Sequence, residues 1–396
     1  MSRTAACRLA AIVATGGLLL AACADDADDP DLADAGEQSP ADVDGESAAA
    51  ADPVTIFPGE EWSYTDPEDM GFDPDKLEEL AAEAEEADST CVVVTRDGQI
   101  VAEWYWGDTD ATTMQEAWSV TKSYTSTLVG IAAAETDLDL DDGAAEYIDE
   151  WSGSDSDDIT IRNILSNDSG RTWLGSLGFD DSYVALTVAS DRTAYALDLG
   201  QDTPPGTNWE YNDGAIQALE PILEEATGQP PANYAREKIF EPIGAEHSEM
   251  TLDDAGNTAL YFGLQTTCQD MARFGYLFLQ DGVWDGEQVL PEDWVEEATA
   301  PSQDLNLGYG YLWWLSTSPH PADDTATDDG DESDPNNGQD ASDTPEGMYW
   351  AQGLGGQTIQ IHPETNTVVT RIGSQTFGGS YGSGDTTRFV TEALLD

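Results

Sequence analysis

The stretch that most constrains the fold is Trp118–Ser123, which holds a serine and a lysine three residues apart, Ser119 and Lys122. The uncharged residues that follow, 124–132, predict a single buried helix. Residues i and i+3 lie one turn apart on one helix face, so these two side chains are predicted to be neighbours. A serine hydroxyl needs a base to take its proton, and a lysine serves only when burial or a nearby cation lowers its pKa. The pattern alone is common, so its meaning depends on the rest of the chain.

The second constraint is charge. The 396 residues include 80 acidic and 13 basic side chains, which gives a net charge of −67. Self-repulsion of this size is tolerated best where salt screens it, so the composition predicts a salty habitat. An acidic secreted protein that its charge keeps soluble explains the same composition. Nucleic acid and anionic membrane surfaces are poor partners for such a field.

The N-terminus is predicted to be a targeting segment. Arg3 and Arg8 precede an apolar stretch that is too short to span a bilayer, Leu9–Leu20. It ends in Leu-Ala-Ala-Cys at Cys23, which resembles the lipobox of bacterial lipoproteins. The resemblance implies removal of residues 1–22, lipidation of Cys23 and an extracytoplasmic protein that contacts the membrane only through this lipid. A plain secretory signal is the alternative.

Two further segments cannot build a core. Residues 23–55 are rich in Asp, Ala and Pro and are predicted to form a disordered acidic tether. Residues 317–346 hold ten acidic residues and no aliphatic side chain larger than alanine, which predicts a disordered insertion within the folded domain, 56–396. Cys91 and Cys268 then form either a disulfide or two buried free thiols.

The remaining pattern predicts an α+β fold, in which helices occupy the middle of the chain and strands the two ends. Strands at both ends are predicted to share one antiparallel sheet flanked by helices, and residues 171–203 are predicted to be irregular. The predicted strands are 91–95, 99–106, 308–315, 348–352, 357–362 and 367–373. The predicted helices begin at Pro74, Ser119, Ile159, Ile216, Pro231, Thr267 and Thr386, the last of them ending at Leu395.

Four segments, in this order, resemble the serine β-lactamase and penicillin-binding-protein superfamily. The likeness is greatest to its class C branch, which also holds carboxylesterases and 6-aminohexanoate-dimer hydrolases. Ser119–Lys122 resembles the first motif, with nucleophile and lysine. The other three are the I-T-I-R-like stretch at Ile159–Gly170, a Tyr-x-Asn-like motif at Tyr211–Asp213, and Gly353–Gln357 between two strands. The resemblance implies a β-lactamase/transpeptidase-like fold from about Ile56 to the C-terminus.

The resemblance also implies a catalytic centre of Ser119, Lys122 and Tyr211. An ammonium near the Tyr211 phenol is expected to lower the pKa of the phenol, which would let it carry a proton to the leaving group. The backbone N–H groups of Ser119 and Gln357 are implied as the oxyanion hole. No cofactor and no metal is implied, and the three histidines, His247, His320 and His362, are predicted to be structural.

The glycines beside this oxyanion hole, Gly355 and Gly356, allow a substrate to approach the backbone. Two positions depart from the family pattern. Asp213 stands where the family has an asparagine at its substrate site. Leu354 stands where β-lactamases carry a lysine or histidine that binds a substrate carboxylate. Arg371 is a possible substitute cation, although an ordinary ion pair in the sheet is the favoured interpretation of this arginine.

The leading hypothesis is therefore a serine hydrolase that cleaves a small ester or amide through an acyl-enzyme on Ser119. One alternative is a DD-peptidase or β-lactamase that acts on peptidoglycan peptides or β-lactams. The other is a penicillin-binding-like lipoprotein that binds a ligand without turnover.

Overall fold

The computed structural model describes residues 55–174, 182–316, 344–373 and 381–395. Contacts divide the chain after Pro53, and every described residue belongs to the second unit, Val54–Asp396. The predicted signal peptide, the lipidation site Cys23, nearly all of the tether and residues 317–343 of the insertion, with His320, lie outside the described residues.

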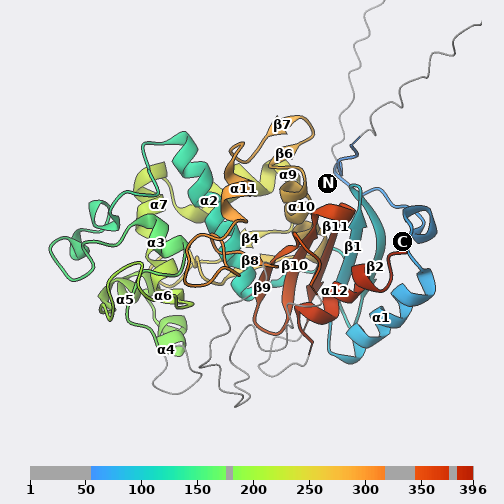
Figure 1. The fold of residues 1–396 in the computed structure, drawn as a ribbon, viewed down its shortest axis with the longest axis horizontal. Coiled ribbons are helices and arrows are strands. Elements are labelled where there is room, and N and C mark those ends of the chain that lie inside the picture. Colours follow the sequence, from blue (N-terminus) through green and yellow to red (C-terminus); the bar gives the residue numbers. More distant parts are fainter. Residues whose placement is uncertain (1–54, 175–181, 317–343, 374–380, 396) are drawn as a thin grey trace, which may run out of the picture. The chain divides into compact units, whose positions relative to one another are not determined.

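One antiparallel sheet joins the two ends of the folded unit, as predicted (Figure 1). Its strand order is β2-β1-β11-β10-β9-β8, so the early hairpin lies beside late strands and the fold is α+β. The bounds are β1 Cys91–Arg96, β2 Gln99–Tyr105, β8 Trp314–Leu315, β9 Tyr349–Gly353, β10 Gln357–His362 and β11 Thr367–Ile372.

Helices cover both faces of this sheet, and the side chains of β1 show why. Successive strand residues point to opposite faces. Val92 and Val94 pack in a core with α1 (Pro74–Glu86) and α12 (Ser383–Thr391). Cys91 and Val93 pack in the larger core with α10 (Cys268–Leu279). A sheet that is buried on both faces needs a continuous apolar strand, and Cys91–Val94 supplies it.

The middle of the unit is helical, and no helix within the described ranges is long and apolar enough to cross a membrane. Short strands occur at β3 (Gln115–Glu116), β4 (Glu249–Met250), β5 (Leu264–Thr266), β6 (Val283–Trp284) and β7 (Glu287–Gln288). The helices are α2 Thr121–Glu135, α3 Ile161–Leu165, α4 Ser182–Val188, α5 Arg192–Asp198, α6 Asp213–Gln217, α7 Leu219–Thr227, α8 Pro231–Ala235, α9 Glu241–Ile243 and α11 Trp294–Ala298. A π-helical turn, Arg236–Phe240, connects α8 to α9.

Three details of the prediction were wrong. The segment predicted to be irregular, 171–203, contains α4 and α5, because Asp191 accepts a hydrogen bond from the Ala194 N–H and caps α5. The predicted strand 308–315 is reduced to β8, because Leu312 has a φ of 61° and turns the chain. The last helix is α12, which begins and ends before the predicted bounds.

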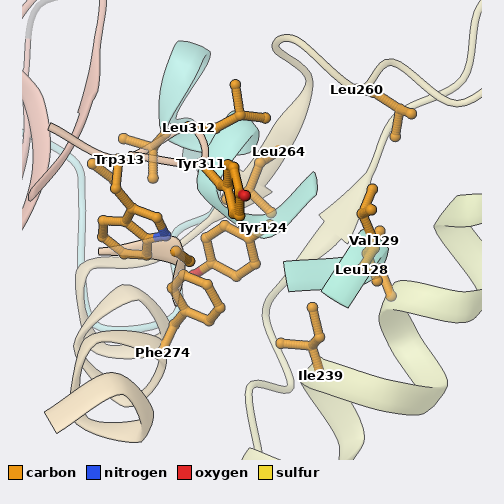
Figure 2. Close-up of a cluster of buried hydrophobic side chains, with 14 of the residues drawn as sticks. Tyr124, Leu128, Val129, Ile239, Leu260, Leu264, Phe274, Tyr311, Leu312 and Trp313 are labelled. Carbon is orange, nitrogen blue, oxygen red and sulfur yellow. The ribbon is translucent and has the colours of Figure 1, made fainter. Parts of the chain in front are cut away.

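Helix α2 runs through the larger core, and all its residues from Thr121 to Ala132 are buried. The Tyr124 ring stacks on Phe274 of α10 at a centroid distance of 3.7 Å (Figure 2). Hydroxyl side chains of α2 donate to backbone carbonyls, for example Thr125 Oγ1 to Leu260 O at 2.7 Å. Several hydroxyl groups of the helix are bonded in this way, whereas those of Tyr124 and Ser126 are buried without a hydrogen-bond partner among the described residues. The predicted buried helix is therefore present, and it carries Lys122 into a dry environment.

A disulfide joins β1 to α10 through Cys91 and Cys268, whose Cα atoms are 6.3 Å apart. This separation lies within the roughly 7 Å that a disulfide spans. Of the two states that the sequence left open, the structure contains the bonded one.

The folded surface keeps the acidic excess of the composition, because four acidic side chains of the described residues, Asp168, Asp213, Glu220 and Asp270, are buried along with four basic ones. Apart from Arg3 and Arg8, the chain has eleven basic residues, and four of them are buried: Lys122, Arg171, Arg273 and Arg371. Seven cations therefore remain to balance the acids of the folded surface. The acidic excess therefore belongs to the folded unit as well as to the tether and the insertion.

We expect the melting temperature to rise by several degrees between low and molar NaCl, because screening relieves the repulsion among surface carboxylates. The measurement is made on the full chain and on a variant that lacks residues 24–53 and 322–346. A melting temperature of the shortened variant that does not respond to NaCl would contradict the salt-dependent fold.

The stability of the fold is also expected to depend on pH, because of His362. Its side chain is buried at the end of β10, and burial lowers its pKa from 6.5 to about 3. The unfolded chain therefore binds a proton between these two pH values that the folded chain does not. Stability should fall as the pH drops from 6.5 toward 3, with a slope of up to about 1.4 kcal/mol per pH unit. The His362→Leu variant should lose this contribution in pH-dependent melts, and His247→Leu should keep it.

Candidate active site

The turn that carries Ser119 is held in an unusual backbone conformation. Trp118 has a φ of 50°, which is rare for a large side chain and is found mainly where the surrounding structure enforces it. The preceding residue, Ala117, donates its N–H to Leu264 O at 2.9 Å, which anchors the turn to β5. Ser119 then lies in a single 3₁₀ turn, Trp118–Val120, directly before α2. The chain thus fixes the serine between a strand and a buried helix.

Lys122 is 1% exposed, and its ammonium makes three short contacts. Nζ lies 2.9 Å from Ser119 Oγ, 2.7 Å from Tyr261 O and 2.6 Å from Asp213 Oδ1. These contacts use all three of its donors. Burial lowers the pKa of Lys122, whereas the charge of Asp213 acts in the opposite direction. The predicted pairing of Ser119 with Lys122 is therefore present, and Asp213 joins it as a third member.

Tyr211 completes the group, because its hydroxyl is hydrogen-bonded to Ser119. Its ring stacks on Trp314 at 5.9 Å, and Lys122 Nζ lies over the ring at 4.7 Å from the centroid. The expected lowering of the phenol pKa is wrong. Burial, and then the negative charge of Asp213, raise the pKa of Tyr211 above its usual value. Tyr211 is consequently a neutral phenol.

The I-T-I-R-like stretch and its continuation position the Tyr211 segment. Asn167, whose φ is 57°, accepts from the Asn212 N–H through Oδ1 at 3.2 Å and from the Glu210 N–H through its carbonyl at 2.8 Å. The Asn212 side chain caps α6 by accepting from the Ala215 N–H at 2.8 Å. These bonds clamp the chain on both sides of Tyr211 and at the start of α6, where Asp213 is the first residue.

Gly353, at the end of β9, packs directly against the nucleophile turn. A Cβ atom at this position would lie 2.3 Å from Ala117 O and 3.1 Å from Ser119 N, so only glycine permits the approach. Gln357, which the resemblance implied for the oxyanion hole, lies opposite Gly353 on β10. Its buried side chain donates to Leu354 O at 2.8 Å and accepts from the Gly373 N–H at 2.7 Å. Gln357 thus braces the turn between β9 and β10.

The turn itself contains Gly355 and Gly356, both with a φ of 77°. The favoured interpretation of Arg371 as a member of an ion pair is wrong for the described residues, where no carboxylate forms a salt bridge with it. Its guanidinium is 1% exposed and donates to neutral oxygens, one of which is the Gly355 carbonyl. Arg371 is therefore turned into the protein and does not offer its charge to a substrate carboxylate.

The histidines lie apart from these contacts. The His247 backbone N–H donates to Asp270 Oδ2 at 2.8 Å, beside the start of α10, and His362 is buried at the end of β10. The described ranges contain no group of three or more His, Cys, Asp or Glu side chains with the arrangement of a metal site. The contacts described above bring together Ser119, Lys122, Tyr211 and Asp213.

Sequence reasoning missed three contributors to this site: Asn167, Asn212 and the carbonyl of Tyr261. The two asparagines lie inside motifs that the resemblance had marked, but a motif does not say which member makes the clamp. The Tyr261 carbonyl carries no side-chain signal, because a backbone acceptor is chosen by the fold and not by the residue type.

Comparison with known proteins gives a family and a fold. The family described as Beta-lactamase matches residues 75–389. The chain is 23% identical over 331 residues to a 6-aminohexanoate-dimer hydrolase of Paenarthrobacter ureafaciens, with 76% of each chain covered. It is also 23% identical over 316 residues to a beta-lactamase of Lysobacter lactamgenus, covering 72% of this chain and 74% of that one. Among solved structures, the octameric penicillin-binding protein homologue from Pyrococcus abyssi is similar, with a TM-score of 0.60 and 19% identity, covering 81% of this chain and 77% of that one.

Proposed function

The chain belongs to the beta-lactamase family, and we propose that it is a serine hydrolase that cleaves a small ester or amide through an acyl-enzyme on Ser119. The observation that carries the proposal is the 2.9 Å contact between Lys122 Nζ and Ser119 Oγ, in a site where burial lowers the pKa of the lysine. A nucleophile and its base must lie within hydrogen-bond reach, and these two do.

The proposed proton route uses Asp213. The ammonium of Lys122 passes one proton to the Asp213 carboxylate, 2.6 Å away, and becomes an amine. The amine takes the proton of Ser119 as Oγ attacks the substrate carbonyl. Tyr211 donates its phenol proton to the leaving oxygen or nitrogen and is reprotonated from Lys122. Water then repeats the sequence in reverse to release the acid.

Esters and simple amides are favoured over β-lactams and D-alanyl peptides, which carry a carboxylate that such enzymes bind with a cation. Leu354 has no charge, and the Arg371 side chain is buried among neutral oxygens. The relatives named above include a hydrolase of an aminohexanoate dimer, which supports a simple amide as one substrate class. A DD-peptidase or β-lactamase, and a lipoprotein that binds without turnover, remain the alternatives.

Covalent labelling distinguishes these proposals. A fluorophosphonate probe and a fluorescent penicillin are added to the wild type and to the Ser119→Ala variant. We expect fluorophosphonate to label the wild type and to lose this label in the variant, with little labelling by penicillin. Preferential labelling by penicillin would favour the DD-peptidase or β-lactamase alternative. Labelling by neither probe would favour a binding protein.

Turnover gives a quantitative form of the same prediction. Short-chain p-nitrophenyl esters should be hydrolysed much faster than nitrocefin, because Leu354 offers no charge for the nitrocefin carboxylate. Leu354→Lys should improve the binding of carboxylate-bearing substrates, with Leu354→Met as the uncharged control of similar length. Efficient hydrolysis of nitrocefin by the wild type would refute this specificity.

We also propose that the mature protein is extracytoplasmic and held at the membrane by a lipid on Cys23. Support comes from the sequence before this residue, Arg3 to Ala22. Mass spectrometry of the N-terminal peptide from wild-type and Cys23→Ser cells tests it, since only the wild type should carry a diacylglyceryl group.

A further inference from the structure

A buried arginine lies behind the turn that faces the nucleophile. Arg371, on β11, donates from Nε to Ser89 Oγ at 2.8 Å, from Nη2 to Ala87 O at 3.2 Å and from Nη1 to Gly355 O. The ring of Tyr381 packs against the guanidinium at a centroid distance of 4.8 Å. A buried charge that meets only neutral acceptors is costly to keep, so its hydrogen bonds need an explanation.

Two glycines make room for this guanidinium. A Cβ atom on Gly356 would lie 2.7 Å from Arg371 Nη1, and one on Gly373 would lie 2.0 Å from Nη2. The site for the arginine is thus built by the β9–β10 turn and the end of β11 together. This arrangement fixes where the Gly355 carbonyl points.

The Gly355 carbonyl is the start of a relay through two peptide groups. The same peptide carries the Gly356 N–H, which donates to Gly353 O at 3.2 Å. The Gly353 carbonyl in turn shares its peptide with the Leu354 N–H, and no backbone carbonyl in the described ranges accepts from that N–H. Hydrogen bonds in series polarise one another, by roughly 10–30% per bond. A cation at one end therefore makes the N–H at the other end a stronger donor.

The far end of the relay lies at the nucleophile. Gly353 approaches the Ser119 backbone so closely that a Cβ would lie 3.1 Å from Ser119 N. The Leu354 N–H belongs to the peptide that follows Gly353, directly after the end of β9. An oxyanion hole needs two such donors near one point.

We propose that Arg371 is a positioning residue for the oxyanion hole: through the Gly355 and Gly353 peptides it orients and polarises the Leu354 N–H, which binds the carbonyl oxygen of the substrate together with the Ser119 N–H. The inference rests on the proposed function, since it concerns the same acyl transfer. Arg371 itself touches neither substrate nor reacting atoms.

The test compares Arg371→Lys and Arg371→Met with the wild type on a p-nitrophenyl ester and on the matching thiono ester. Loss of the relay should lower kcat for the oxygen ester by roughly 2–10-fold, which is less than the loss of a direct donor, with KM nearly unchanged. The thiono ester should lose much less, because sulfur accepts hydrogen bonds poorly. The affinity of phenylboronic acid, which forms a tetrahedral adduct with the serine, should fall by the same factor as kcat.

Arg273→Lys is the matched control. Arg273 is also a buried guanidinium bound to neutral carbonyls, those of Ile243, Gly59 and Glu60, but it lies on α10 beside Trp62. Replacement of Arg273 should reduce stability. It should leave the affinity for phenylboronic acid, and the ratio of kcat for the oxygen ester to kcat for the thiono ester, at wild-type values.

The proposal would be overturned if Arg371→Lys lost stability but kept the wild-type ratio of the two kcat values and the wild-type affinity for phenylboronic acid. If Arg371→Met fails to fold, Ser89→Ala keeps the guanidinium and removes one of its acceptors, and both readouts should shift in the same direction by a smaller factor. Failure of the proposed function is distinct, since the wild type would then neither turn over the ester nor bind the boronate. That result would overturn both ideas.

Discussion

Lys122→Met is expected to lower kcat/KM on a short-chain ester by at least about 10²-fold, the usual scale of general-base catalysis, and Ser119→Ala to abolish turnover. The physical reason is that Lys122 Nζ is the only ammonium of the described residues that contacts Ser119 Oγ. Tyr211→Phe should cost at least about 10²-fold as well, because the variant removes the phenol proton. The rates are measured on the purified variants across a pH series.

Lys122→Met removes the ion-pair partner of the buried Asp213 carboxylate, so the variant needs a control for stability. Removing one partner of a buried ion pair strands the other and destabilises the fold by about 3–5 kcal/mol. The double variant Lys122→Met/Asp213→Asn removes both charges of the pair, whose atoms are 2.6 Å apart. It should regain stability and remain inactive. Near wild-type rates in the double variant would show that Lys122 is not the base.

Asp213→Asn separates the roles of the pair. The negative charge of Asp213 raises the pKa of Lys122 against the larger effect of burial, so its removal should lower that pKa further. The amine is the active form in acylation, and the acid limb of kcat/KM should therefore move to lower pH. A limb that stays in place or moves to higher pH would contradict the effect of the Asp213 charge on the pKa of Lys122.

The fold was accessible from the sequence where the pattern was continuous. The apolar run Cys91–Val94 and the uncharged run after Lys122 predict a strand covered on both faces and a buried helix, and both are present. The short helices α4 and α5 were missed, because each is seven residues long and too short for a helical periodicity to be seen. Tertiary packing, not local preference, decides such segments.

The candidate site, like the fold, could be predicted only in part from the sequence. The side chains proposed to carry the chemistry, Ser119, Lys122 and Tyr211, stand in motifs that are visible in the sequence. What the sequence could not show is how the motifs are buried and brought together, and two of its errors follow from that. The pKa of Tyr211 is raised by burial and then by the nearby charge of Asp213, and the acceptors of Arg371 depend on the path of the turn between β9 and β10.

The second large effect is expected from the disulfide. Cys91 and Cys268 are 177 residues apart, and the loop-entropy model gives about 5 kcal/mol for a closed loop of this length. Measured values are often smaller, but even half of it is a large part of the 5–15 kcal/mol by which domains are stable. Cys91→Ala/Cys268→Ala should therefore lower the free energy of unfolding by several kcal/mol in denaturant melts.

Reduction of the wild type distinguishes the effect of the crosslink on stability from the effect of replacing the two cysteine side chains. Reduction of the wild type opens the bond and keeps both cysteine side chains, so its effect on unfolding reports the crosslink alone. Reductant should leave the double variant unchanged. Neither cysteine side chain belongs to the contacts of Ser119, Lys122 or Asp213, so the turnover of the protein that remains folded should stay at the wild-type rate. A melting curve of the wild type that does not respond to reduction would show that the bridge contributes no stability, and that the packing of β1 against α10 alone holds these elements together.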